Sequence, residues 1–372
     1  MRARWPVAVL HQAAEPPVVG GQRKAMKPGG YSDSGADIAY TLQQQGWSVV
    51  TPSPRPDPEV AMDWVFPDTR EGLAAAAAGG AQVLWANTVL FEGHPLEARA
   101  SKAWIVGQPT RAAQAADDKF ATNRRLAMAG LPVARSFLAD ERLLERPGDF
   151  EDCLSAISLS GSDWVVKPVR GRGSQGVVLA HGVDGVRSAV ADLLASGRFG
   201  DRAMVERYLP GDELTIAVMP PGQPGEAHAA LPPVRRINHV EGVAPYNGDV
   251  AVVRNSEALA PREWTREPIL ELMAACARAA AVVGARAPVR IDCRLDPEGR
   301  YRLFDLNMKP NMTGAGRPGR DDQDSLVALA ARARGWTYGD LLEIMAWSAW
   351  KDARDGFVTL LAREQAFSHA TD

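Results

Sequence analysis

The hydrophobic and polar positions in the first part of the chain predict short strands that alternate with helices. The apolar run Trp5–Leu10 has strand character, and after a long polar loop the apolar positions of Ala36–Gly46 follow a helical period. Trp47–Thr51 is a second predicted strand, Glu71–Gly80 an alanine-rich helix closed by glycines, and Gln82–Asn87 a third strand. Strands and helices in alternation indicate a small α/β domain.

The rest of the chain continues with longer helices and more strands. Acidic residues mark the start of one helix near residue 117, and Gly130 marks its end. Two strands joined by Pro210-Gly211 predict a bend between two lobes. The expected helices are Asp117–Gly130, 182–198, Trp264–Val283, Asp324–Gly335 and Tyr338–Trp350, and the expected strands are Leu131–Leu138, Ala203–Leu209, Glu213–Met219, Ala227–Ile237 and Asp249–Val253.

Two runs with strand character predict a β-hairpin in the C-terminal third of the chain. Pro288–Leu295 and Arg300–Asn307 flank the turn-forming residues 296–299. If those residues form the whole loop, Arg290 lies opposite Asp305.

The two faces of this hairpin differ in character, because successive side chains of a strand point to opposite sides. The apolar face carries Val289, Ile291, Cys293, Leu295, Phe304 and Leu306. The other face gathers Arg290, Asp292, Asp305 and Asn307. Carboxylate and amide oxygens beside an arginine suit a hard cation such as Mg²⁺ that holds phosphates. The alternative is a half-exposed hairpin whose charges only face water.

The glycine-rich segment at residues 164–180 contains a deceptive motif. Gly171, Gly173 and Gly176 match the dinucleotide-binding fingerprint, which requires a helix directly after the glycines. Val177–Ala180 is β-branched and apolar instead, so a strand is expected there. The fingerprint is therefore rejected, and the segment predicts a hairpin with a glycine-rich flap.

This flap has features of a phosphate-binding loop. Glycines free backbone N–H groups, and Ser174 adds a hydroxyl, so the loop can cradle phosphates without a helix. Lys167 lies just before it in an apolar strand, where a cation needs a partner. An ordinary glycine-rich hairpin is the alternative.

Composition narrows the class of protein. At 372 residues the chain has room for two or three domains, and a net charge of −3 with a pI near 6.1 gives no broad basic field for nucleic acid or an anionic membrane. The apolar run near the N-terminus is too short for a signal peptide, and no segment has the ~18 apolar residues of a membrane span. The three cysteines are widely spaced and read as reduced core residues. A cytoplasmic protein is expected.

From about residue 113 to 346 the chain resembles the ATP-grasp enzymes, most closely their D-alanine–D-alanine ligase branch. Each matching piece alone is weak, but five in the family's order and approximate spacing are a specific signal. The pieces are Asp118-Lys119 at a helix start, Val166-Lys167-Pro168 before the flap, Val205-Glu206 through Glu213, Arg290-Ile291-Asp292, and Phe304-Asp305 through Thr313.

The resemblance implies a role for each matching residue. Lys119 and Lys167 would contact ATP phosphates, and the flap would close over them. Glu206 and Leu209 would meet the adenine edge, and Glu213 the ribose hydroxyls. The implied flap residues are Gly173, Ser174, Gln175 and Gly176, and the implied metal ligands are Asp292, Asp305 and Asn307.

The reaction implied by the resemblance is an ATP-dependent ligation. A carboxylate accepts the γ-phosphoryl group, and an amine then displaces phosphate from the acyl phosphate to give an amide. One or two Mg²⁺ ions would bridge the β- and γ-phosphates, with Mn²⁺ as a substitute. Arg290 would stabilise the tetrahedral intermediate, and Lys309 and Ser174 complete the expected catalytic set. The partners are then a small-molecule carboxylate and amine, such as a small amino acid or related metabolite, and analogy adds a homodimer.

Some residues depart from the family pattern. Asp305 stands where the family usually has glutamate, and Lys309 and Asn311 replace small residues. The cation at Lys309 is similar to an arginine of the biotin carboxylase branch. A bicarbonate-using carboxylase and a non-catalytic nucleotide-binding module therefore stay as alternatives.

The first domain matches the family only by topology. Its loop offers Lys24 and Lys27 where the ligases present a carboxylate. With Arg317 and Arg320 these lysines favour a substrate with an extra carboxylate or phosphate.

The expected fold is α/β, with α+β character in the ATP-grasp part, in a three-domain architecture that holds the nucleotide between two lobes. Residues 1–110 form the N-terminal α/β domain, 111–208 the central lid domain with the flap, and 209–350 the C-terminal domain with the metal site. Residues 351–372 are assigned as a tail.

Overall fold

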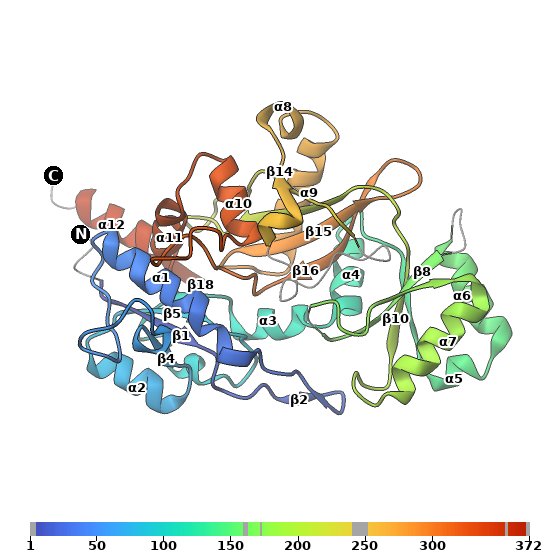
Figure 1. The fold of residues 1–372 in the computed structure, drawn as a ribbon, viewed down its shortest axis with the longest axis horizontal. Helices are drawn as coiled ribbons and strands as arrows, with labels where there is room; N and C mark the ends of the chain where they lie inside the picture. The colour runs from blue at the N-terminus through green and yellow to red at the C-terminus, as the bar shows by residue number, and fades with distance from the viewer. Residues whose placement is uncertain (1–4, 159–162, 172, 240–251, 354–355, 370–372) are drawn as a thin grey trace.

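The computed structural model describes residues 5–158, 163–171, 173–239, 252–353 and 356–369. Its strands form three main sheets and one short hairpin. In Figure 1 the N-terminal and C-terminal sheets lie side by side, and the central part of the chain extends to one side of them. No helix among these residues is both long and apolar enough to cross a membrane.

The N-terminal sheet has the strand order β18-β17-β6-β5-β1-β4. Its first strand is buried on both sides, since Val7 and Val9 face one core while Ala8 and Leu10 face another. Such two-sided burial is typical of parallel strands covered by helices. The parallel strands are β1 (Val7–His11), β4 (Val65–Pro67), β5 (Val83–Asn87) and β6 (Trp104–Val106), and the helices are α1 (Ser32–Gln44) and α2 (Arg70–Ala78).

The C-terminal end of the chain returns to this sheet. β17 (Trp350–Ala353) pairs with β6 through Trp350 and Ile105, and β18 (Gly356–Thr359) pairs with β17. The helix α12 (Leu360–His369) follows. Residues assigned as a tail therefore extend the N-terminal sheet instead. The expected strand Trp47–Thr51 is reduced to one bridge between Val7 and Val49.

The lid sheet, with the order β7-β10-β8-β9, forms the central part of the chain. Helices pack on the face of this sheet that points away from the other two sheets, around a core that includes Phe150, Val166 and Val205 (Figure 1). β8 and β9 pair as an antiparallel hairpin, so strands flank the glycines on both sides, as expected. The strands are β7 (Ser136–Ala139), β8 (Asp163–Pro168), β9 (Val178–His181) and β10 (Ala203–Arg207), and the helices are α5 (Glu141–Leu144), α6 (Pro147–Ile157) and α7 (Gly182–Ala195).

Two helices connect the N-terminal sheet to the lid sheet. They are α3 (Thr110–Ala116) and α4 (Lys119–Met128). The Asp118 side chain caps α4 by accepting a hydrogen bond from the Ala121 backbone N–H at 2.8 Å. This cap fixes the start of α4, and Lys119 is the first residue of that helix.

The C-terminal sheet has the strand order β14-β13-β11-β15-β16, with β12 paired to β11. α9 packs on one face, and α10 and α11 lie on the other, next to α1 (Figure 1). The strands are β11 (Glu213–Met219), β12 (Ala229–Ala230), β13 (Val234–Arg236), β14 (Ser256–Ala258), β15 (Val289–Leu295) and β16 (Tyr301–Asn307). The helices are α8 (Pro261–Trp264), α9 (Ile269–Val282), α10 (Leu326–Ala333) and α11 (Tyr338–Trp347).

The β15–β16 hairpin forms in a different register from the expected one. Leu295 pairs with Tyr301, so the loop is one residue longer, and Arg290 lies opposite Asn307 rather than Asp305. The longer loop accounts for one residue of this shift, and a bulge between Asp292 and Cys293 accounts for the second.

The bulge also changes which side chains are buried. Leu303 lies in the core with Leu306, while Phe304, expected in the apolar face, lines the cavity described below. A bulge leaves one residue unpaired, and this breaks the strict alternation of faces.

The loops hold short elements that the pattern did not predict. β2 (Val18–Val19) and β3 (Gln22–Arg23) form a hairpin in the polar loop after β1. Gln22 Nε2 donates to Gly197 O at 2.7 Å, so this hairpin reaches the lid, as Figure 1 shows. The expected strand Asp249–Val253 lies mostly outside the described residues, and Val252–Arg254 is a 3₁₀ helix. The other 3₁₀ helices are Pro28–Tyr31, Ala61–Asp63 and Pro95–Arg99.

Candidate active site

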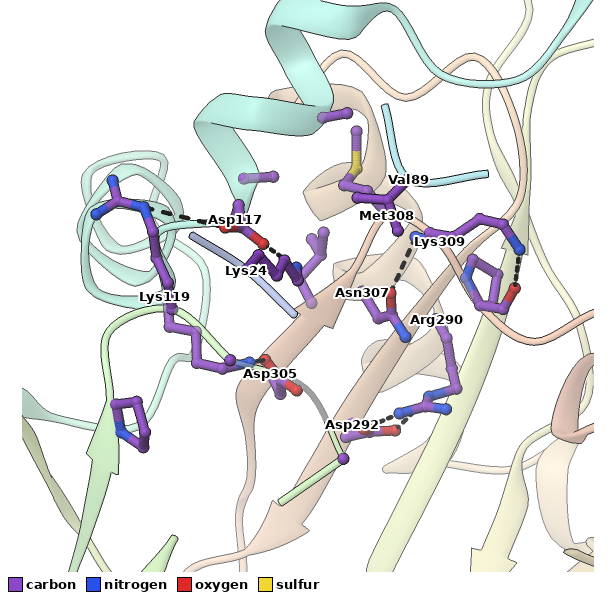
Figure 2. Close-up of a pocket in the computed structure, with 18 of the residues that line it drawn as sticks. Lys24, Val89, Asp117, Lys119, Arg290, Asp292, Asp305, Asn307, Met308 and Lys309 are labelled. Carbon is purple, nitrogen blue, oxygen red and sulfur yellow. Dashed lines mark hydrogen bonds and ion pairs between the residues drawn. The ribbon is translucent and has the colours of Figure 1, made fainter. Parts of the chain in front are cut away.

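A cavity of about 770 Å³ lies where the three sheets meet. Its walls come from the loops after β1 and β5, the flap of the lid sheet, and one face of the C-terminal sheet. Of the residues predicted to bind the nucleotide or metal or to take part in catalysis, all except Gly176 line it. Figure 2 shows several of these side chains around the same space.

The floor of the cavity is a set of polar side chains in cross-strand register. Thr215, Asp292 and Asp305 lie opposite one another on β11, β15 and β16. Two residues along the strands, and therefore on the same face, Arg290 lies opposite Asn307. The structure therefore brings together all four residues of the predicted polar face, in spite of the shifted loop.

Asp292 is held by two neighbours. Arg290 donates to both of its carboxylate oxygens, at 3.2 and 2.9 Å, and Thr215 Oγ1 donates to Oδ1 at 2.7 Å. Burial lowers the pKa of Arg290, but the adjacent Asp292 outweighs burial and raises the pKa overall. The arginine is thus fixed as a cation at the floor of the cavity.

Asp305 is paired with a lysine from the other lobe. Lys119 Nζ lies 2.5 Å from Asp305 Oδ1 (Figure 2). Burial raises the pKa of Asp305, but the Lys119 ammonium outweighs it, so the pKa lies below its usual value. The carboxylate is therefore ionised and available to a cation at neutral pH.

The donor set fits a hard metal ion. Among the described residues no cluster of His, Cys, Asp and Glu side chains is arranged as a metal site. The candidate here mixes the carboxylates of Asp292 and Asp305 with the amide of Asn307, and oxygen donors of this kind suit Mg²⁺ or Mn²⁺. Lys119 and Arg290 balance the two carboxylates in this structure.

Asn307 and Lys309 are linked at the end of β16. The Lys309 backbone N–H donates to Asn307 Oδ1 at 2.9 Å, which orients the amide. The Lys309 ammonium donates to Asn87 Oδ1 at 2.9 Å and lies 4.3 Å from the centre of the Tyr31 ring. Lys309 therefore points toward the N-terminal sheet rather than toward the two aspartates.

Lys167 and Glu206 form a buried ion pair on the lid sheet. Lys167 Nζ lies 2.8 Å from Glu206 Oε1 and donates to Phe304 O at 3.1 Å. Asn123 Nδ2 donates to the second oxygen of Glu206 at 3.2 Å. Burial raises the pKa of Glu206, although Lys167 opposes the shift. Glu206 thus orients the lysine, and its implied contact with adenine stays a prediction.

The flap contains residues with left-handed backbone conformations. Ser174 has φ = 57° and lines the cavity with Gly173 and Gln175. Gly176 has φ = 71°, and a Cβ there would lie 2.9 Å from the Phe199 ring. Gly176 is therefore required for packing against Phe199, while its predicted phosphate contact stays untested.

Leu209 and Glu213 lie on either side of the bend between the two lobes. Leu209 lines the cavity. The Glu213 carboxylate is 2.8 Å from His239 Nε2 and 3.5 Å from Arg294 Nε. Both residues face the cavity, as a nucleotide-binding role requires.

Two arginines expected near the substrate lie elsewhere. Arg317 and Arg320 each contact the buried Asp37 carboxylate of α1 at 2.8 Å, and neither lines the cavity. They join the C-terminal part of the chain to the N-terminal sheet, so their assignment to substrate recognition is wrong. Lys24, which does line the cavity, is paired with Asp117 (Figure 2).

Several cavity residues have no sequence signal. Thr215 holds Asp292, and Asn87 and Tyr31 contact Lys309. Arg236 on β13 also lines the cavity. Each of these residues depends on pairing between distant segments, which no local pattern reveals.

The glycine flap over one lobe and the acidic face of the other define an ATP-grasp ligase. Solved structures support this fold at 16% and 15% identity. The D-alanine–D-alanine ligase of Bacillus anthracis complexed with ATP matches with a TM-score of 0.59, over 92% of this chain and 95% of that chain. The ligase of Coxiella burnetii matches with a TM-score of 0.60, over 99% and 97%.

The sequence comparisons identify the family itself. The family described as "D-ala D-ala ligase C-terminus" matches residues 126–346, more than half of the chain, so the chain belongs to this family. The D-alanine–D-alanine ligase of Gloeobacter violaceus is 27% identical over 237 residues, which span 64% of this chain and 70% of the relative. That of a Synechococcus species is 29% identical over 239 residues, which span 64% and 66%.

Membership in this family confirms the predicted reaction class. The chain is an ATP-dependent, ADP-forming carbon–nitrogen ligase that forms a peptide bond between small molecules and uses ATP with a divalent metal ion. Of the three functions considered from the sequence, the family supports the ligase.

Proposed function

We propose that this ligase activates a small amino acid or related metabolite that carries a second anionic group. The observation that carries the proposal is the charge of the cavity wall formed by the N-terminal sheet and its loops. Among the described residues up to 110, the lining includes Arg23, Lys24 and Lys27 but no Asp or Glu. A substrate ammonium group would therefore find no carboxylate on this wall. Arg23 and Lys24 are already paired with Glu15 and Asp117, so the anionic group is assigned to the neighbourhood of Lys27.

Lys27 and Lys309 mark the expected position of that anionic group. The Lys27 ammonium lies 5.0 Å from the centre of the Tyr31 ring, and the Lys309 ammonium 4.3 Å from it. Two ammonium groups beside one aromatic ring make a local positive potential, which attracts a carboxylate or phosphate.

The chemistry of the proposed reaction is assigned to the other cavity residues. Lys119 and Lys167 neutralise the phosphates, and the flap keeps water from the acyl phosphate. Arg290 stabilises the oxyanion that forms when the amine attacks. When bound at Asp292, Asp305 and Asn307, a divalent ion neutralises charge on the transferred phosphoryl group.

Mg²⁺ is the proposed metal, because all the candidate ligands are oxygen atoms, with Mn²⁺ as a substitute. The homodimer, the cytoplasmic location, the absence of nucleic-acid partners and the domain boundaries at residues 110, 208 and 350 are further proposals from the sequence.

A substrate screen tests the proposed acid. ADP release and product mass are measured with D-alanine, dicarboxylic amino acids and phosphorylated acids, each with pooled amines. We expect turnover with an anionic acid, and an increase of roughly 10-fold or more in its KM for Lys27→Ala and for Lys309→Ala, as expected when a charged contact is lost. Lys102→Ala, outside the cavity, is the matched control. Preference for D-alanine, or an unchanged KM in both variants, would refute the proposal.

A further inference from the structure

Thr215 is a buried threonine at the floor of the cavity, and its hydroxyl is directed at a predicted metal ligand. Its exposed fraction is 2%, and Thr215 Oγ1 donates to Asp292 Oδ1 at 2.7 Å. The two residues lie directly opposite each other in the antiparallel pairing of β11 with β15. A β-branched side chain is restricted at χ1, so a buried threonine here holds its hydroxyl in a fixed direction.

The contacts of Asp292 fill one of its two carboxylate oxygens. Oδ1 accepts from Thr215 and, at 3.2 Å, from Arg290 Nε, whereas Oδ2 accepts from Arg290 Nη2 at 2.9 Å. A carboxylate oxygen has about two lone-pair directions, so both directions of Oδ1 are taken and Oδ2 keeps one. Asp292 can therefore meet a cation through Oδ2 alone.

The residues that orient Asp292 belong to its own sheet. Thr215 lies on β11, and Arg290 lies on β15, the strand that carries Asp292. Asp305, in contrast, is paired with Lys119 of α4, which lies outside this sheet. On the β16 side a bulge follows directly after Asp292 and disrupts the ladder locally. The direction of the Asp292 carboxylate therefore depends on Thr215 and Arg290.

The number of carboxylate oxygens that are open to a cation affects the choice of metal ion. Ca²⁺ takes carboxylates with one or both oxygens in a flexible geometry, whereas Mg²⁺ requires near-ideal octahedral geometry. A carboxylate limited to one oxygen therefore disfavours Ca²⁺ relative to Mg²⁺. We propose that Thr215 is a positioning residue that makes Asp292 a one-oxygen ligand and thereby selects Mg²⁺ over Ca²⁺. The inference rests on the proposed metal site and not on the proposed acid.

Binding of metal–nucleotide complexes without any acid or amine tests this role. The dissociation constants of Mg·ATP and Ca·ATP are measured by calorimetry, and their ratio is compared between the wild type, Thr215→Val and Thr215→Ser. Thr215→Val keeps the shape but removes the hydroxyl, so we expect it to weaken Mg·ATP binding roughly 10-fold, as is typical when a partner of a metal ligand is lost. Ca·ATP binding should change little. Thr215→Ser keeps a hydroxyl and should retain the wild-type ratio.

Thr359→Val is the matched control. Thr359 is 1% exposed and ends β18 of the N-terminal sheet, outside the lining of the cavity. Its hydroxyl oxygen accepts from the Ala362 N–H at 3.3 Å, so the same substitution again removes one hydrogen bond of a buried threonine. We expect Thr359→Val to leave both dissociation constants unchanged.

Three results would overturn the proposal. An unchanged ratio in Thr215→Val at an unchanged urea midpoint would exclude the hydroxyl from metal selection. Equal weakening of both complexes would assign the hydroxyl to the nucleotide rather than to Asp292. A changed ratio that persists in Thr215→Ser would assign the effect to packing. If Thr215→Val does not fold, Thr215→Ala decides by the same measurement.

Asp292→Asn separates this inference from the proposed metal site. If Asp292→Asn binds Mg·ATP like the wild type, the metal site is wrong and the role of Thr215 is overturned with it. If Asp292→Asn loses Mg·ATP affinity while Thr215→Val keeps the wild-type ratio, the metal site stands and only the role of Thr215 is overturned.

Discussion

The buried pair between Lys167 and Glu206 gives the sharpest test of how charge is held in this site. Their side chains are 6% and 4% exposed, and their charged atoms are 2.8 Å apart. The substitution Glu206→Gln keeps the shape but leaves the lysine without its anion. Removing one partner of a buried ion pair costs about 3–5 kcal/mol, so we expect Glu206→Gln to lower the free energy of unfolding by roughly that amount.

Urea unfolding followed by tryptophan fluorescence measures this loss as a lower midpoint at constant slope. The double variant Lys167→Met with Glu206→Leu should recover most of the stability, because replacing both charges by apolar groups is often neutral. It should not recover activity, since the phosphate-binding ammonium is gone. If Glu206→Gln lowers the free energy of unfolding by less than about 1 kcal/mol, the pair behaves like an exposed ion pair, and the prediction of a costly unpaired buried lysine is refuted.

Three further predictions concern the metal face and the flap. Asp292→Asn should abolish metal-dependent ATP turnover, which a coupled ADP assay over a Mg²⁺ titration checks. The folded-state pKa of Asp305 is lowered from 3.8, so its contribution to the free energy of unfolding is complete above pH 3.8 and is lost as pH falls through the folded pKa. Asp305→Asn should therefore reduce the fall in the free energy of unfolding at acid pH, which urea unfolding at a series of pH values measures. Gly176→Ala should cost about 1 kcal/mol or more because of its positive φ and the close Phe199 ring, and should raise the KM for ATP. Gly185→Ala in α7, where a Cβ meets nothing within 4 Å, should not lower stability, because alanine is the better helix former, and should leave the KM for ATP unchanged.

Local patterns predicted the parts of the site that are local in sequence. The strand on each side of the flap follows from the β-branched residues beside the glycines, and β15 and β16 lie where their alternation placed them. The longer loop and the bulge that moves Phe304 into the cavity were missed, because one extra residue leaves no mark on the alternation.

Pairing between strands that are distant in the sequence could not be predicted from local patterns. Arg236 and Thr215 reach the site because β13 and β11 pair beside β15, and this strand order is not encoded in any local segment. Arg317 and Arg320 were misassigned for the same reason, since their partner Asp37 lies in a distant helix. The pairing of Trp350 with Ile105 could not be read from two short apolar runs.

The return of β17 and β18 to the N-terminal sheet determines how the molecule can move. Because both ends of the chain meet in one sheet, the C-terminal sheet is tied to the N-terminal sheet from both directions. The lid sheet is then an insertion, attached by the segment around α4 and by the bend after β10. We therefore expect the lid sheet to move relative to the other two sheets by rotation about these two covalent crossings.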